Sequence, residues 1–168
     1  MKDLRRSEEA VMDYPFRLLI ISIVLAIAIP SMLSALSYYR TQSAEEQLSQ
    51  EVDQIASAVE SVYIQGINAS TVVDLDLPEE TEYVEIGAPL SDSIDCRAIY
   101  HKIQDQSESS ILVKHGREGI PMTSQDNITV TLTSSTKRIS VVKRPVNFDI
   151  DDDGTHVNDY YVEIKKLR

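Results

Sequence analysis

The chain has 168 residues, with 16 Lys and Arg against 27 Asp and Glu, which gives a formal net charge of −11. Such an acidic chain repels the phosphates of nucleic acids, so DNA or RNA binding is excluded. Cys96 is the only cysteine, which also excludes an intramolecular disulfide. The length suits one membrane helix followed by one modest domain.

An apolar stretch from Leu18 to Leu36 contains no charged residue. It is long enough to cross the hydrocarbon core of a bilayer as a helix. No other segment is apolar enough to cover all sides of such a helix in a soluble core. We therefore predict a single transmembrane helix over residues 18–38, preceded by a cytoplasmic leader over residues 1–17.

The distribution of basic residues predicts the direction of this helix. Basic residues precede the apolar stretch at positions 2, 5, 6 and 17, whereas residues 37–56 contain only Arg40. Because basic flanks stay on the cytoplasmic side, we expect a cytoplasmic N-terminus and an extracytoplasmic C-terminal domain at the cell membrane. Two alternatives remain open: the reverse orientation, and a secretory signal cleaved at the small-x-small sequence of residues 35–37.

Pro30 lies inside the apolar stretch and removes one backbone hydrogen bond, which predicts a kink near residues 26–30. Ser31 and Ser34 follow on the same part of the helix, where small hydroxyl side chains let another helix approach closely. One interpretation is a tolerated membrane proline followed by serines bonded to their own backbone. The other is a packing site for other helices at Pro30 and Ser34.

Residues 39–66 continue the helical pattern as an amphipathic segment, so one helix is expected from about residue 11 to residue 65. Its apolar residues recur at spacings of four and three, as on a helix with one buried face; these seam residues are Leu48, Val52, Ile55, Val59 and Val62. Gly66 suits the position just beyond a helix end. The seam packs either on the sheet of the chain's own domain, which we favour, or on a partner helix.

The N-terminal part combines a short charged leader with the sequence SEEAV, an apolar helix with a central proline, and an amphipathic continuation before a β-rich region. In this order, over residues 5–66, it resembles archaeal type IV pilin-like proteins. The resemblance implies cleavage between Arg6 and Ser7 by a prepilin peptidase. It also implies that the helices bundle into a filament core or a membrane-associated complex, with no catalytic role. Pro15 and Arg17 at the helix start, and the lack of a glycine at the cleavage position, depart from the family's pattern and favour a minor or accessory component.

From residue 67 the pattern changes to short alternating segments separated by turn signals, which is typical of strands. The predicted strands are 71–77, 82–86, 94–103, 110–114, 127–133, 138–143, 146–150 and 160–165. They predict an α+β fold, in which a long N-terminal helix, transmembrane and then amphipathic, precedes a mostly antiparallel β-sandwich-like domain over residues 67–168.

An acidic segment between the last two predicted strands has the spacing of a calcium loop. Oxygen ligands at alternate positions followed by glycine can wrap around the ion, and the candidate ligands are Asp149, Asp151, Asp153, Thr155 and Asp159. Tyr160 stands where such loops carry a bidentate glutamate, so Asp159 or Glu163 would have to replace it. The other interpretation is a solvent-exposed hairpin turn built on the sequence DDDG. No cofactor other than calcium is expected.

Two triplets, beginning at Asn68 and Asn127, match the acceptor sequence for N-linked glycans. His101, His115 and His156 are too widely spaced for a metal site and are expected at the surface or in loops. The chain has no GxSxG motif, no glycine-rich phosphate loop and no HExxH motif. We therefore expect neither enzyme activity nor a small-molecule substrate.

These patterns predict a pilin-like, single-pass membrane protein that is a structural component or accessory of a cell-surface appendage or envelope assembly. Its expected partners are the membrane and other pilin-like helices, including further copies of itself. The alternative, from a different class, is a membrane-tethered extracytoplasmic binding module, calcium-dependent if the acidic loop holds the ion.

Overall fold

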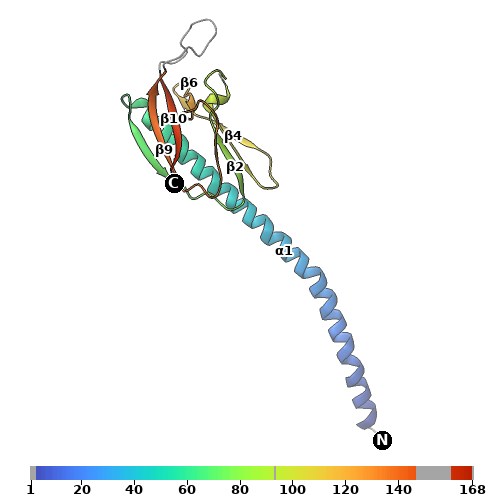
Figure 1. Ribbon diagram of the computed structural model, residues 1–168. Coiled ribbons are helices and arrows are strands. Elements are labelled where there is room, and N and C mark those ends of the chain that lie inside the picture. Colours follow the sequence, from blue (N-terminus) through green and yellow to red (C-terminus); the bar gives the residue numbers. More distant parts are fainter. Residues whose placement is uncertain (1–2, 93, 147–159, 168) are drawn as a thin grey trace. The chain divides into compact units, whose positions relative to one another are not determined.

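The computed structural model describes residues 3–92, 94–146 and 160–167 (Figure 1). The chain divides into two compact units, Met1–Gln42 and Ser43–Arg168. One long helix, α1 (Asp3–Ile64), contributes residues to both units and is followed, over the described residues, by ten strands. The α+β class predicted from the sequence is confirmed.

α1 begins earlier than the sequence predicted and continues through both of its prolines, Pro15 and Pro30. Each proline removes one backbone hydrogen bond, but the bonds of the flanking turns keep the helix intact. The expected disturbance near residues 26–30 therefore does not end the helix. α1 ends at Ile64, two residues before Gly66.

The strands are short and follow the helix in sequence. They are β1 (Ser70–Asp74), β2 (Thr81–Ile86), β3 (Ala98–Ile103), β4 (Ser109–Leu112), β5 (Lys114–His115), β6 (Glu118–Gly119), β7 (Met122–Thr123), β8 (Val130–Leu132), β9 (Arg138–Pro145) and β10 (Tyr160–Leu167). A single 3₁₀ turn, η1 (Asp95–Arg97), precedes β3 among these elements.

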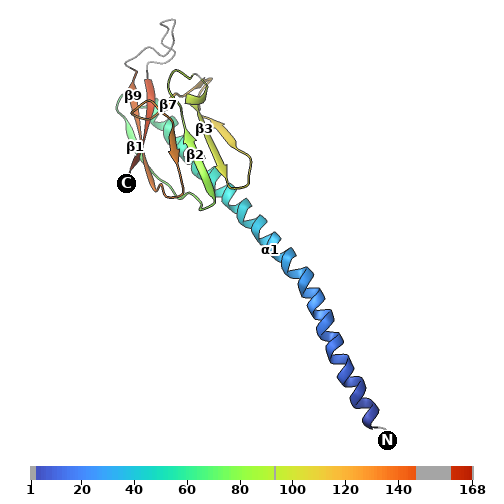
Figure 2. The same ribbon diagram turned by 45° about the vertical axis from the view of Figure 1, so that its right-hand side comes forward.

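Two four-stranded sheets make up most of the domain, in the orders β1-β9-β10-β7 and β4-β3-β2-β8, while β5 and β6 form a separate pair. β1 and β9 lie on one side of the domain and β2 and β3 on the other (Figure 2). All of these pairs are antiparallel except β10 with β7. The longest pairing joins β9 and β10, from Tyr160 opposite Pro145 to Leu167 opposite Arg138.

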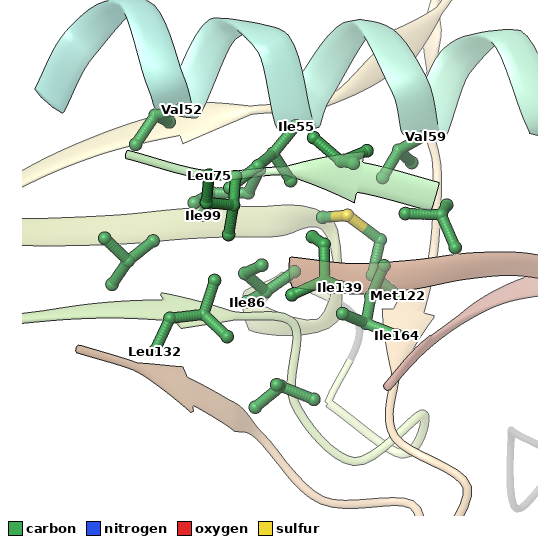
Figure 3. Close-up of a cluster of buried hydrophobic side chains, with 14 of the residues drawn as sticks. Val52, Ile55, Val59, Leu75, Ile86, Ile99, Met122, Leu132, Ile139 and Ile164 are labelled. Atoms are coloured by element: carbon green, nitrogen blue, oxygen red, sulfur yellow. The ribbon is translucent and has the colours of Figure 1, made fainter. Parts of the chain in front are cut away.

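The core of the domain lies between the helix and the two sheets. Side chains of α1, including Val52, Ile55 and Val59, point towards strand residues such as Ile139 and Ile164 (Figure 3). All five are buried to 0 or 1 % exposure. Burying a side chain of this size contributes about 1.5–3 kcal/mol, so residues 43–64 of α1 are an integral part of the domain.

The predicted start of one strand was wrong. The strand expected at 94–103 begins only at Ala98, because Asp95–Arg97 forms η1 and the Asp92 carboxylate accepts the main-chain N–H groups of Ile94 and Asp95. Of the strand predicted at 146–150, residues 147–150 lie outside the described part of the chain, so it stays a prediction; Val146 itself is not in a strand. β5, β6 and β7 were not predicted, because two residues are too few to show an alternating pattern.

Candidate functional site

The membrane-facing candidate is the apolar part of α1. Within the described residues, this is one helix long and apolar enough to cross a membrane, and none of its apolar window is buried. Its large apolar side chains are about half or more exposed, from Leu18 at 54 % to Leu36 at 48 %. An exposed apolar surface of this length is stable in lipid and unfavourable in water.

The hydroxyl groups in this stretch are largely satisfied by the helix itself. Ser22 Oγ donates to the Leu18 carbonyl at 2.8 Å, and Ser31 Oγ donates to the Ile27 carbonyl at 3.0 Å. Such bonds remove the cost of a polar group in lipid, where water cannot replace them. Ser31 therefore follows the simpler of the two interpretations drawn from the sequence, a serine bonded to its own backbone.

Around Pro30 and Ser34, the helix does not satisfy all of its own hydrogen-bonding groups. Pro30 has no N–H to donate to the Ala26 carbonyl, and residues 26, 30 and 34 lie on one stripe because they are four residues apart. In the described residues, no hydrogen bond is made by the Ser34 hydroxyl, although the Ser34 carbonyl accepts one from Ser37 Oγ at 2.9 Å. This stripe is therefore small, exposed and incompletely hydrogen-bonded.

The amphipathic seam of α1 lies inside the domain and not at the membrane-facing part of the helix. Its five predicted members are all buried to at most 1 % exposure inside the domain's own core; they are Leu48, Val52, Ile55, Val59 and Val62. Ala44 continues the same face. Polar residues between the seam positions, such as Gln50 and Gln54, are exposed. The seam therefore packs on the sheets of the chain's own domain, which is the partner that we favoured from the sequence.

Lys143 joins the end of α1 to the first sheet, and sequence reasoning missed this residue. Its ammonium group donates hydrogen bonds to the carbonyls of Tyr63 and Gln65, the latter at 3.0 Å. It also lies 5.0 Å from the ring centroid of Tyr63 and 4.7 Å from that of Tyr160. The carbonyls at a helix C-terminus lack intrahelical partners and carry partial negative charge, so this cation caps the helix from the sheet.

The two sequons have different environments. Asn68 is exposed, and its Oδ1 accepts one bond from Arg144 at 3.1 Å, which leaves the amide nitrogen that carries a glycan without a bond here. Asn127 Oδ1 accepts the Leu90 N–H at 2.9 Å and so holds two loops together. Both have positive φ, 64° and 55°. Asn68 is therefore the better placed acceptor.

The candidate calcium ligands Asp149, Asp151, Asp153, Thr155 and Asp159 lie outside the described residues. Over the described ranges, no group of three or more His, Cys, Asp or Glu side chains is arranged to hold a metal ion. Arg6 and Ser7 are within α1, but only their backbone is described. The predicted processing site and calcium loop thus remain predictions.

His101 was expected at the surface or in a loop, which is wrong. It lies partly buried in β3, and its Nδ1 is buried without a hydrogen-bond partner in the described structure. Burial lowers the pKa of His101, against an opposing effect of Glu45 and Asp53. Cys96 is buried with Ala88 and Leu90, and burial raises the pKa of its thiol.

Together, the fold and these surfaces define an α+β chain with a lipid-compatible helix and a single β-rich domain. Comparisons with protein-family models, with curated proteins and with solved structures found no match for this chain. The function must therefore be inferred from the geometry of the chain itself.

Proposed function

We propose that this chain is a pilin-like, single-pass membrane protein with a cytoplasmic N-terminus, acting as a structural or accessory component of a cell-surface or envelope assembly. Its membrane helix associates with the helices of other copies or of similar proteins. The observation that carries the proposal is the exposed stripe of Ala26, Pro30 and Ser34 in an otherwise apolar helix that continues into a folded domain.

The physical argument for helix association is local. Lipid supplies no hydrogen-bond donor to the carbonyl that Pro30 leaves without a partner, nor a partner to the Ser34 hydroxyl. Small residues on the same stripe allow two helix backbones to come close, and polar groups can then bond between helices. Since the seam from Leu48 to Val62 is buried in the domain, association is expected through the membrane part.

The test compares two substitutions that add the same kind of bulk. Ser34→Leu places a large side chain on the stripe, whereas Ala35→Leu places it about 140° from Pro30 around the helix. We expect chemical cross-linking in native membranes to show fewer oligomers for Ser34→Leu and unchanged oligomers for Ala35→Leu. Equal oligomer populations in both variants and the native chain would contradict the proposal.

A second candidate function is a membrane-tethered extracytoplasmic binding module. The burial of the whole seam in the domain favours it, because the folded part then needs no partner helix. In that case the helix only anchors the domain, and every variant in the stripe leaves the cross-linking pattern unchanged.

A further inference from the structure

An open groove lies between β8 and the last residues of β10, lined also by the loop that joins β7 to β8. Its volume is about 360 Å³, which lies within the range of about 300–1,000 Å³ for ligand sites in proteins. Val130 and Ile164 lie at its base, buried to 6 and 1 % exposure. Ile128 at its rim is 56 % exposed, so the groove offers an apolar surface to a ligand.

Strand edges without a neighbour flank this groove. β8 is the last strand of its sheet and pairs only with β2. β10 pairs with β9 along one edge, and its opposite edge pairs with β7 only at Val162 and Glu163. From Ile164 onwards that edge has no hydrogen-bonded neighbour in the described residues, although part of β8 lies close to β10. Backbone N–H and C=O groups at such edges can pair with an extended segment of another chain.

The positive charges in the groove are only partly balanced. Lys165 and Lys166 both line it and are exposed, and none of the ion pairs of the described residues includes them. Two nearby cations, by contrast, have carboxylate partners: Lys137 pairs with Asp76 at 3.6 Å, and Arg138 pairs with Asp74 at 2.6 Å. Asp126 also lines the groove and offsets part of the positive charge. An excess of positive charge remains, in a chain whose formal net charge is −11.

We propose that this groove binds an extended segment of a partner protein in which apolar and acidic side chains alternate. The segment adds to the free edge of β8, packs its apolar side chains on Ile128 and Val130, and brings carboxylates to Lys165 and Lys166. This binding site is independent of helix association at Pro30 and Ser34, so either proposal can fail without the other.

Edge lysines also protect strands from pairing with other chains, and the experiment separates the two roles. The full chain in neutral detergent micelles is titrated into a short fluorescent peptide of alternating valine and glutamate, and anisotropy is measured. We expect saturable binding that weakens with salt. The matched valine–lysine peptide should not bind, and a backbone N-methylated valine–glutamate peptide should lose binding because it cannot pair with a strand edge.

Two charge-matched double variants test the location. Lys165→Glu with Lys166→Glu should bind the acidic peptide about tenfold more weakly, since attractions become repulsions. Lys114→Glu with Arg117→Glu changes two exposed cations around β5 and should leave binding unchanged. Equal unfolding midpoints establish that both variants are folded. No binding by the native chain, or equal weakening in both double variants, would overturn the proposal.

An anionic lipid surface is the other partner that these lysines could attract. The affinity for the valine–glutamate peptide is therefore measured for the native chain and for the Lys165→Glu, Lys166→Glu variant, each in nanodiscs of phosphatidylcholine with and without phosphatidylglycerol. If the two lysines bind the peptide, the ratio of the native affinity to the variant affinity is the same in both lipids. A ratio that falls to one in the anionic nanodiscs would show that lipid occupies the lysines, and would overturn the proposal.

Discussion

Lys143 Nζ caps the C-terminus of α1 by donating to the main-chain carbonyl of Tyr63, and the same ammonium group lies 5.0 Å from the centroid of the Tyr63 ring. These residues are far apart in sequence, one at the end of the helix and one in the middle of β9. The contact therefore ties the last turn of α1 to the first sheet.

Lys143→Met should lower the free energy of unfolding of the domain by about 1–2 kcal/mol, because methionine keeps apolar packing but removes the charge at the helix end and over two rings. Thermal unfolding followed by circular dichroism in detergent measures the loss. Lys165→Met, an exposed position on β10, is the control and should have little effect. A Lys143 variant as stable as the control would show that the contact contributes no stability.

Ile55→Ala should destabilise the domain by about 2–5 kcal/mol, since Ile55 is fully buried and alanine leaves a cavity in the core. Gln54→Ala, one residue earlier on the exposed side of α1, should change stability by less than about 0.5 kcal/mol. Denaturant unfolding of both variants checks this. If both changes were small, the seam would not be packed on the sheets.

Asn68 is expected to carry an N-linked glycan in its native membrane, and Asn127 is not. Asn68 is exposed at the turn before β1, whereas the side chain of Asn127 bonds the Leu90 N–H. Asn68→Gln should therefore remove a mass increment that Asn127→Gln leaves in place. Intact mass spectrometry of the purified protein measures both. A glycan on Asn127 alone would contradict this assignment of the acceptor.

His101 should make the domain less stable in mild acid. Burial lowers the pKa of His101 below its ordinary value of 6.5 in the folded chain. The unfolded chain therefore binds this proton more readily, and the contribution of neutral His101 is present above pH 6.5 and declines as the pH falls below it.

The measurement is denaturant unfolding at several pH values for the native chain and for His101→Gln. Glu45 and Asp53 on α1 are the carboxylates that act on the imidazole, and they remain in both proteins. We expect the stability of the variant to fall less steeply below pH 6.5. Parallel curves for the two proteins would show that His101 does not cause the acid sensitivity.

The sequence alone predicted the features that depend on local patterns. The charge-free stretch from Leu18 to Leu36 predicts a membrane-spanning helix by its length, and the four-three spacing from Leu48 to Val62 predicts a helix with one buried face. The alternating segments that became β2, β9 and β10 were placed within a few residues. In each case neighbouring residues in the chain carry the signal, so no knowledge of distant contacts is needed.

The tertiary structure decided what the seam packs against, because an apolar helix face fits a sheet or another helix equally well. It also decided the roles of Lys143 and His101, whose surroundings come from elements distant in sequence. The free edge of β10 beside Lys165 and Lys166 likewise exists because β7 pairs with β10 only at Val162 and Glu163. Strand pairing, and therefore the absence of a partner, is a property of the assembled sheets and not of any single segment.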